Sequence, residues 1–285
     1  MTRRVALLGT PLRRRHSVVM HNAAFDAAGI DARYELREIE AEAVPVAVAE
    51  ARRPEWLGLG VTAPHKRLVA ELCDVVEPDA QAIGAVNNVV RTDGAELVGI
   101  NTDAPGFRAG VELTLGRPLQ GLDVVVAGAG GVAHAVVYAA LVGGARRVTV
   151  ANRSPAAAVA LAQRLAGVGP GSTGATPLGG PAFGAAVRSA DLAVNATTVG
   201  MIDPGVTIPV HELPPWATVF DCVYVPSETP LLAAARARDL RAANGSEMLI
   251  AQAAAAFERW TGVAGMAHVM RAAVAPLLAD PAAVA

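Results

Sequence analysis

Residues 123–131 have the sequence DVVVAGAGG, and this stretch decides the fold. Its first five residues end in a continuous apolar run, which predicts a buried strand. After the glycine-rich turn, an Ala- and Val-rich segment predicts a helix to about Leu141. Such a turn between a strand and a helix is typical of dinucleotide binding, because small residues let the backbone approach a pyrophosphate at the positive end of the helix. Because Ala133 or His134 occupies the third fingerprint position, an ordinary tight strand–helix turn is the alternative.

The next strand, expected at Arg147–Ala151, ends at a triplet that bears on the choice of cofactor. Folds that prefer NAD usually place an acid there for the ribose 2′-hydroxyl, whereas this chain has Asn152-Arg153-Ser154. A guanidinium matches phosphate geometry, so Arg153 can pair with a 2′-phosphate. The triplet therefore favours NADP. NAD stays possible if Arg153 is a surface arginine that stacks on the adenine.

The rest of the chain alternates strand and helix, which predicts an α/β protein with mostly parallel sheets. In the first half we expect strands at 5–8, 34–39 and 56–61, helices at 17–28, 44–52 and 64–73, and a hairpin of 86–91 with 96–100. In the second half we expect helices at 155–165 and 247–260 and strands at 192–195 and 219–221. The Gly- and Pro-rich segment 167–181 predicts a flexible surface connection.

Composition limits the classes of function. Hydrophobic residues make up 53% of the 285 residues and charged residues 18%, so the chain can bury a full core. A net charge of −2 gives no general attraction to nucleic acid or to an anionic membrane. We expect no membrane span, because the Ala-rich stretches are broken by Gly, Pro or charge.

Cysteine and histidine usage adds two expectations. Cys73 and Cys222 cannot form a disulfide framework and fit a cytoplasmic protein. The six histidines are scattered without ligand spacing, so we expect no metal. One dense basic run, 13–15, is either a solvated loop or a binding element.

Lys66 is the single lysine among 24 basic residues. A lysine can give and take a proton at useful pH, whereas arginine stays protonated. The residue follows a predicted strand end, where ligand sites of α/β proteins gather. The alternative is that Lys66 was retained by chance, and its position at a strand end argues against this.

Eight short motifs together resemble the shikimate dehydrogenase family, in the family's order and over nearly the whole chain. They are Gly9-Thr10-Pro11, Val61-Thr62-x-Pro64-x-Lys66, Gly84-Ala85-Val86-Asn87, Asn101-Thr102-Asp103, Gly128-Ala129-Gly130-Gly131, Asn152-Arg153-Ser154, Asn195-Ala196-Thr197 and Gln252.

The resemblance implies a two-domain enzyme with its active site in the cleft between the domains. It places an N-terminal α/β substrate domain at 1–104, a Rossmann NAD(P)-binding domain at 105–246, and a C-terminal helical segment, 247–285, packing back on the first domain. It implies an NAD(P)-dependent dehydrogenase that reduces 3-dehydroshikimate to shikimate, or acts on a close relative such as quinate. The partner is then a small carboxylated cyclic polyol.

Site residues follow from the same resemblance. The catalytic pair is Lys66, which donates the proton, and Asp103, which orients it and is alternatively a helix N-cap. The substrate contacts are Thr62, Asn87 and Gln252 at the ring hydroxyls and Tyr224 near the carboxylate. The cofactor contacts are Gly128, Ala129, Gly130, Gly131, Asn152, Arg153, Ser154, Thr197, Gly245 and Met248. A buried structural tyrosine and a core methionine are the alternatives for Tyr224 and Met248.

Two positions depart from the family pattern. Where the family offers two serines to the substrate carboxylate, this chain has Arg15-His16-Ser17. Arg15 could hold a carboxylate in fork geometry, fill the site, or bind another anion. Gly60 stands where asparagine is usual, so we expect a lost polar contact and extra room.

Three hypotheses remain open from sequence. The chain is a shikimate dehydrogenase that tolerates Arg15, a paralogue for quinate, an aminated analogue or another cyclic hydroxy acid, or a nucleotide-binding sensor without turnover. Lys66 and Asp103 weigh against the third. The oligomeric state, monomer or homodimer, is open.

Overall fold

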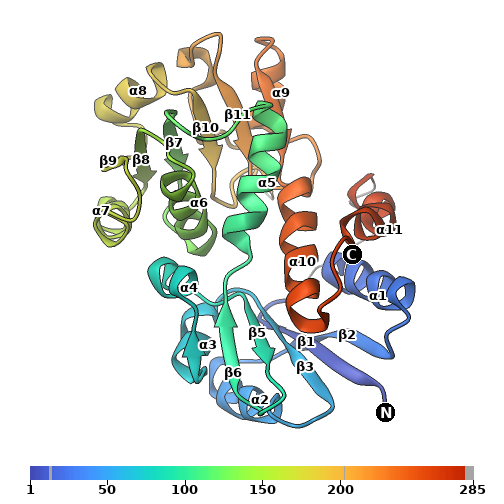
Figure 1. Cartoon of the computed structure of the whole chain (residues 1–285). Coiled ribbons are helices and arrows are strands. Elements are labelled where there is room, and N and C mark those ends of the chain that lie inside the picture. The colour runs from blue at the N-terminus through green and yellow to red at the C-terminus, as the bar shows by residue number, and fades with distance from the viewer. Residues whose placement is uncertain (13–14, 202, 280–285) are drawn as a thin grey trace. The chain divides into compact units, whose positions relative to one another are not determined.

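The computed structural model describes residues 1–12, 15–201 and 203–279. Arg13 and Arg14 of the basic run lie outside the described residues. The chain divides into two compact units, Met1–Thr102 with the residues from Ile250 onward, and Asp103–Leu249. Figure 1 labels their helices and strands where there is room.

Unit 1 is built on a six-stranded sheet in the order β2-β1-β3-β5-β6-β4. Strand β1 pairs in parallel with β2 and β3, and the antiparallel hairpin β5–β6 extends the sheet from β3. The strand bounds are β1 Arg3–Gly9, β2 Ala32–Glu38, β3 Trp56–Val61, β4 Val75–Val76, β5 Asn88–Arg91 and β6 Leu97–Ile100.

The two faces of this sheet are covered by different helices. On one face, Leu8 and Leu59 pack into a core with Ala47 of α2 and Val69 of α3. On the other, α1 lies over β2 and packs on α11. The helix bounds are α1 His16–Ala28, η1 Ala41–Ala43, α2 Val44–Glu50, α3 Lys66–Leu72, α4 Pro78–Ile83, α10 Ser246–Thr261, which begins in unit 2, and α11 Ala267–Ala279.

Unit 2 has a six-stranded sheet, all parallel, in the order β12-β11-β10-β7-β8-β9. The order reverses between β7 and β10, the switch point where ligands bind in open α/β sheets. The strands are β7 Asp123–Ala127, β8 Arg147–Asn152, β9 Ser172–Pro177, β10 Leu192–Asn195, β11 Thr218–Asp221 and β12 Arg241–Asn244.

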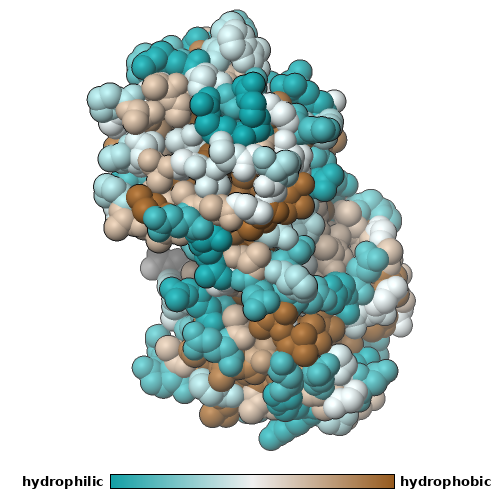
Figure 2. Space-filling model, turned by 60° about the vertical axis from the view of Figure 1, so that its left-hand side comes forward, coloured by the Kyte–Doolittle hydropathy of each residue, from teal (hydrophilic) through white to brown (hydrophobic). Residues whose placement is uncertain are grey.

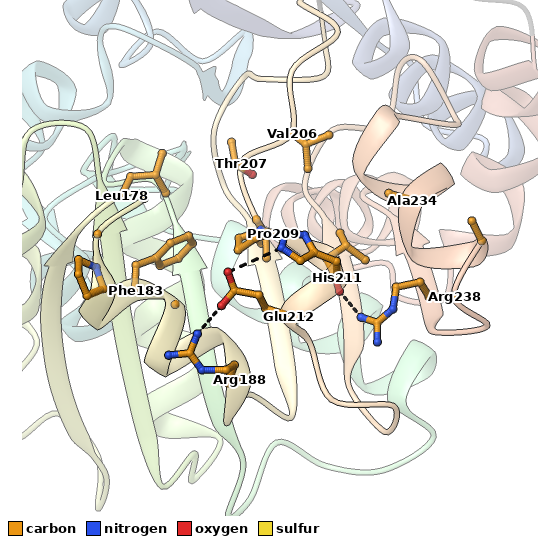
Figure 3. Close-up of a pocket in the computed structure, with 17 residues that line it drawn as sticks. Leu178, Phe183, Arg188, Val206, Thr207, Pro209, His211, Glu212, Ala234 and Arg238 are labelled. Atoms are coloured by element: carbon orange, nitrogen blue, oxygen red, sulfur yellow. Dashed lines mark hydrogen bonds and ion pairs between the residues drawn. The ribbon is translucent and has the colours of Figure 1, made fainter.

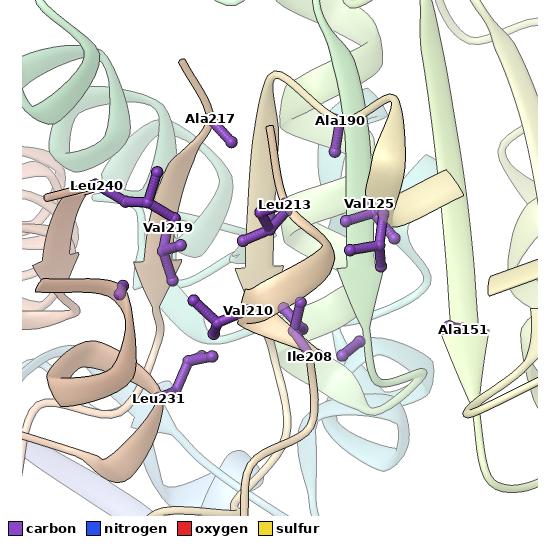
Figure 4. Packing of buried hydrophobic residues seen from close by; sticks show 14 of the residues in the cluster. Val125, Ala151, Ala190, Ile208, Val210, Leu213, Ala217, Val219, Leu231 and Leu240 are labelled. Carbon is purple, nitrogen blue, oxygen red and sulfur yellow. The ribbon is translucent and has the colours of Figure 1, made fainter. Parts of the chain in front are cut away.

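Helices cover this sheet as well. Val125 and Val219 pack against Ile208, Val210 and Leu231 on one face, which is closed by α8, η2 and α9 (Figure 4). Helix α6 packs on β7 and β8, and α5 packs on α6. The bounds are α5 Asp103–Leu115, α6 Gly131–Val142, α7 Pro155–Arg164, α8 Pro181–Arg188, η2 Val210–Glu212 and α9 Pro230–Arg236.

The fold expected from the sequence is confirmed in class and in most elements, with one error. The segment 167–181 is not a simple surface connection, because Ser172–Pro177 forms β9 and pairs with β8 along its length. Its sequence, STGATP, lacks an apolar alternation since an edge strand needs little burial. Elements β4, β12, α4, α8, α9 and α11 were not predicted.

The surface agrees with the composition. On the face shown in Figure 2, hydrophilic residues predominate and hydrophobic residues form small separate groups. No helix of the described residues is long and apolar enough to cross a membrane.

Candidate active site

The ends of β1 and β3 bring Thr62 and Lys66 to one edge of the unit 1 sheet. The Thr62 amide donates to the Leu8 carbonyl at 2.9 Å, so the ladder continues past β3. Gly9 faces Thr62 so closely that a Cβ there would overlap the threonine methyl. Lys66 is the first residue of α3, and its carbonyl accepts from the Val86 amide at 3.0 Å. The lysine therefore follows the end of β3, as the sequence predicted, and its backbone is also tied to the segment before β5.

His65 fixes the turn before the lysine. Its side chain is buried, and its Nε2 lies 2.8 Å from the Ile39 carbonyl oxygen. Sequence reasoning gave His65 no role, because its partner lies on a different loop.

Asn87 belongs to a buried polar network. Asn87 Nδ2 donates to Thr102 Oγ1 at 3.1 Å, and the Thr102 amide donates to Asn87 Oδ1 at 2.8 Å. Asn88 Nδ2 donates to both of these oxygens, at 2.9 and 2.8 Å. Thr102 Oγ1 in turn donates to Gln252 Oε1 at 3.4 Å. Asn87 and Gln252, predicted separately, thus share Thr102, and Asn88 is a member that sequence reasoning missed.

Asp103 follows Thr102 directly in the chain and begins α5. It is 8% exposed. Since Thr102 is fixed by the network of Asn87, the backbone that enters Asp103 is fixed as well. An acid at the first position of a helix is also favoured by the helix dipole, so both interpretations of Asp103 remain compatible with the structure.

Arg15 and Ser17 lie at the start of α1. Arg15 is the residue before the helix and is exposed, and Ser17 is half-buried in the first turn. The first turn carries no acidic side chain. The dipole of α1 and the Arg15 guanidinium therefore make this helix end positive.

Gly60 does not leave room, contrary to the expectation from sequence. The hydroxyl of Tyr34, from β2, occupies the place of a side chain at this position, since a Cβ on Gly60 would lie under 3.0 Å from it. Tyr34 is a neighbour of this position that sequence reasoning missed, because β2 and β3 are separated by β1 in the sheet.

The glycine turn of unit 2 packs against the loop that carries Ala196, and no side chain of the described residues covers the start of α6 at Gly130. Gly128 has φ +117°, and a Cβ there would overlap the Ala196 carbonyl. Gly130 precedes α6, and a Cβ there would have no atom within 4 Å. Both Gly130 and Gly131 are exposed. Open space over the amino end of α6 fits a pyrophosphate.

The triplet after β8 also lies at this edge. Asn152 Nδ2 donates to the Ser154 carbonyl at 3.2 Å, which curls the triplet into the start of α7. The Arg153 side chain is exposed, and Ser154 is the residue before α7. The guanidinium is accessible to a phosphate, and equally to an adenine face.

Thr197 is positioned by a buried network that sequence reasoning missed. Asn195 Oδ1 accepts from Thr197 Oγ1 at 2.7 Å, and Asn195 Nδ2 donates to Asp221 Oδ1 at 2.9 Å. The Asp221 side chain accepts from Thr229 Oγ1 at 2.6 Å. Burial raises the pKa of Asp221, and these donors oppose that rise.

Gly245, Met248 and Tyr224 follow the neighbouring strands β12 and β11. A Cβ on Gly245 would overlap the Cys222 carbonyl, so glycine is required where these chains meet. Met248 is buried, and its backbone lies against Gly110 of α5, which supports a packing role. Tyr224 is half-buried.

A pocket of about 1120 Å³ lies elsewhere in unit 2, between α8, η2 and α9 (Figure 3). Arg188 pairs with Glu212 at 2.5 Å across it, and Arg238 donates to the Leu213 carbonyl at 3.0 Å. Of the described residues that line it, none was predicted as a site residue. Groups of three or more potential metal ligands are absent from the described part of the chain.

Comparisons with known proteins point the same way. A model of the shikimate dehydrogenase substrate-binding domain matches residues 7–89, and a model of the shikimate 5′-dehydrogenase C-terminal domain matches 245–275. The chain is 41% identical over 285 residues to a shikimate dehydrogenase (NADP(+)) of Citrifermentans bemidjiense, which covers 98% of this chain and 97% of that protein.

Two solved structures are similar over nearly their whole length. The shikimate 5-dehydrogenase of Thermus thermophilus in complex with NADP(H) and shikimate has a TM-score of 0.83 at 36% identity, covering 95% of this chain and 99% of that one. Quinate dehydrogenase from Corynebacterium glutamicum in complex with NAD has a TM-score of 0.89 at 33% identity, covering 97% and 99%.

Proposed function

The chain belongs to the shikimate dehydrogenase family, and from this premise we propose that it interconverts shikimate and 3-dehydroshikimate with NADP(H). The observation that carries the proposal is the placement of Lys66 and Thr62 at the ends of β1 and β3, with 41% identity to a shikimate dehydrogenase over the whole chain.

Lys66 is the acid and base of the proposed reaction. NADP(H) supplies or accepts the hydride at the ring carbon. When the ketone is reduced, a proton must reach its oxygen, and the Lys66 ammonium donates it and stabilises the developing alkoxide. In the oxidative direction the neutral amine accepts the same proton. Asp103 orients the lysine and binds a substrate hydroxyl.

The remaining unit 1 contacts hold the ring. Asn87, whose amide is already fixed by Thr102 and Asn88, is preorganised for a ring hydroxyl. Thr62 and Gln252 bind other hydroxyls. We propose that Arg15 and Ser17, at the positive end of α1, hold the substrate carboxylate, and that Tyr224 lies near it.

Unit 2 holds the cofactor in this proposal. The bare amides of Gly130 and Gly131 at the start of α6 bind the pyrophosphate, with Gly128 and Ala129 shaping the turn. Asn152, Arg153 and Ser154 bind the adenosine end, and the exposed Arg153 guanidinium pairs with the 2′-phosphate. Thr197, Gly245 and Met248 lie toward the nicotinamide.

A cytoplasmic location is also a proposal. Cys73 and Cys222 are both free thiols in the described structure. Proteins kept in a reducing compartment retain such cysteines.

The test is absorbance at 340 nm with NADP⁺ or NAD⁺, each with shikimate and with quinate. Turnover of shikimate with NADP⁺ at a kcat/KM at least tenfold above the other pairs is the expected result. Quinate is the second candidate, because a quinate dehydrogenase shares this fold at 33% identity and Arg15 departs from the family pattern. Turnover of quinate alone would make quinate the substrate in place of shikimate. Cofactor binding without turnover of either acid would exclude both acids as substrates.

A further inference from the structure

One face of the unit 1 sheet carries two glycines beside the site. Strand pairing places Tyr34, Val5 and Gly58 in one row and Leu36, Leu7 and Gly60 in the next. Side chains two residues apart share a face, so Gly60 lies on the face of Thr62. Leu59 and Val61 point the other way, into the core.

Aromatic side chains from distant segments occupy the space over both glycines. The Trp260 indole lies over Gly58, and its Nε1 donates to the Val89 carbonyl at 2.9 Å. The Tyr34 hydroxyl lies over Gly60. Any side chain at position 60 would displace this hydroxyl, so the glycine and the tyrosine act as a pair.

The Tyr34 ring is held firmly in this place. The Asn22 side chain binds both backbone groups of Tyr34, accepting from its amide at 2.8 Å and donating to its carbonyl at 3.0 Å. His21 stacks on the ring with centroids 4.4 Å apart, and Tyr34 is 4% exposed. The hydroxyl is therefore preorganised.

The hydroxyl itself has no hydrogen-bond partner among the described residues, since the bonds of Tyr34 are those of its backbone. A buried tyrosine hydroxyl normally has one. The oxygen is not among the described side-chain polar atoms that are fully buried without a partner, so part of its surface is open. Burial raises the pKa of Tyr34, so the hydroxyl remains a donor at working pH.

Helix α1 indicates which part of a substrate would reach this donor. Ser17 and His21 are one helical turn apart and share a face of α1. Because His21 stacks on Tyr34, the face that carries Ser17 is turned to the same surface of the sheet. The proposed carboxylate end of the substrate and the Tyr34 hydroxyl thus lie on one side.

We propose that Tyr34 is a specificity-determining residue that donates a hydrogen bond to the substrate carboxylate, and that Gly60 is present to admit it. This inference rests on the proposed function, since it names a further contact of the same site. A neutral hydroxyl bound to a carboxylate makes a charge-assisted bond, which is stronger than a bond to an uncharged group.

The test pairs a residue change with a substrate change. Tyr34→Phe is expected to raise KM for shikimate about tenfold, with kcat and the KM for NADP⁺ unchanged. For the methyl ester of shikimate, which lacks the carboxylate charge, the same substitution should change KM less than about threefold. Equal effects on acid and ester, or no effect on either, would overturn the proposal.

Two further variants control the experiment. Tyr138→Phe removes the hydroxyl of a buried tyrosine in unit 2 and should leave both KM values unchanged. Gly60→Ala keeps the tyrosine but displaces its hydroxyl, so it should raise KM for shikimate like Tyr34→Phe. The double variant should then be no worse than either single one, whereas additive effects would count against a shared contact.

The outcomes also separate this inference from the proposed function. If the wild-type protein turns over shikimate and Tyr34→Phe behaves like it, only the inference is wrong. If no variant turns over shikimate, the proposed function is wrong, and titration calorimetry with shikimate decides the inference. Weaker binding by Tyr34→Phe than by wild type would support the contact, and equal binding or none would overturn it.

Discussion

At the scale of single residues, the side chains proposed to act on the substrate are held in place by hydrogen bonds of their neighbours. Lys66 begins α3 directly after the buried His65, and the ladder contact of Thr62 holds the start of the same turn. Asn87 has its amide fixed on both sides. Such supports hold reacting groups in one geometry, which is what proton transfer requires.

Lys66→Ala should lower kcat by about 10²–10⁴-fold, because the proton donor is lost. The Kd for NADP⁺, measured by fluorescence titration, should stay within twofold of wild type. Lys66→Arg keeps the charge but cannot exchange the proton, so it should be nearly as inactive. Wild-type kcat in Lys66→Ala would remove the acid/base role.

Arg15→Ser should raise KM for shikimate about tenfold if the guanidinium holds the carboxylate. The side chain is exposed, so the effect should weaken at high salt. Steady-state kinetics at low and high ionic strength measure both. Unchanged KM at low salt would mean that Arg15 points to solvent.

His21 should make unit 1 sensitive to acid. Burial lowers its pKa from 6.5 to about 3, so the folded state keeps it neutral while the unfolded state takes up a proton below pH 6.5. The stability is complete above that pH and falls as pH drops toward 3, by about 2 kcal/mol at pH 5.

The measurement is urea unfolding at pH 7 and pH 5 for wild type and His21→Phe. Phenylalanine keeps the stacking on Tyr34 but cannot take up a proton. The loss between the two pH values should therefore be about 2 kcal/mol smaller in the variant. The same loss in both proteins would assign the acid sensitivity to other groups.

At the scale of elements, two glycines of the turn from β7 to α6 differ in what their surroundings require. Gly128 serves the fold, since its φ is +117° and its Cα faces the Ala196 carbonyl. Gly130 meets no atom of the chain, so the fold does not require it. The open space at this position is where the proposed pyrophosphate would lie.

Gly128→Ala and Gly130→Ala should therefore separate stability from binding. Gly128→Ala should lower the free energy of unfolding by about 1–3 kcal/mol, through the positive φ and the overlap with Ala196. Gly130→Ala should leave the melting temperature unchanged but weaken NADP⁺ binding at least about tenfold, because its methyl meets the pyrophosphate. Wild-type affinity in Gly130→Ala would place the pyrophosphate elsewhere.

At the scale of the whole molecule, the chain crosses between two compact units twice. It leaves unit 1 after Thr102 and returns within α10, between Leu249 and Ile250. In unit 1, α10 is anchored by Trp260 on Val89 and by the Arg259–Glu77 ion pair at 2.5 Å. Each unit has its own core and its own share of the proposed site.

Each ligand alone should then protect its own unit from hydrogen exchange. NADP⁺ at about 100 times its Kd adds about 2.7 kcal/mol to the unit that binds it, so 128–131 and 152–154 should exchange more slowly. Shikimate alone should slow 62–66 and 87–88. Mass spectrometry of peptides measures both. Protection of 87–88 by NADP⁺ alone would show that the cofactor is not confined to unit 2.

The sequence alone was enough to predict the α/β class and most of the elements, and the residues of the proposed site are predictions from the same sequence. The glycine turn at 128–131 and the strand end before Lys66 depend on local backbone and hydropathy patterns, which a single stretch of chain displays. The resemblance of eight motifs to those of a known family then indicated the family, and whole-length relatives confirm it.

Only the tertiary structure decided what depends on contacts between distant segments. Strand β9 exists because β8 offers its edge, although STGATP has no strand pattern of its own. Thr102 and Gln252 meet across 150 positions of sequence. The hydroxyl of Tyr34 fills the space over Gly60, where the sequence led us to expect extra room. The sequence could not show this, because the order of strands in the sheet, and not their order in the chain, decides which side chains become neighbours.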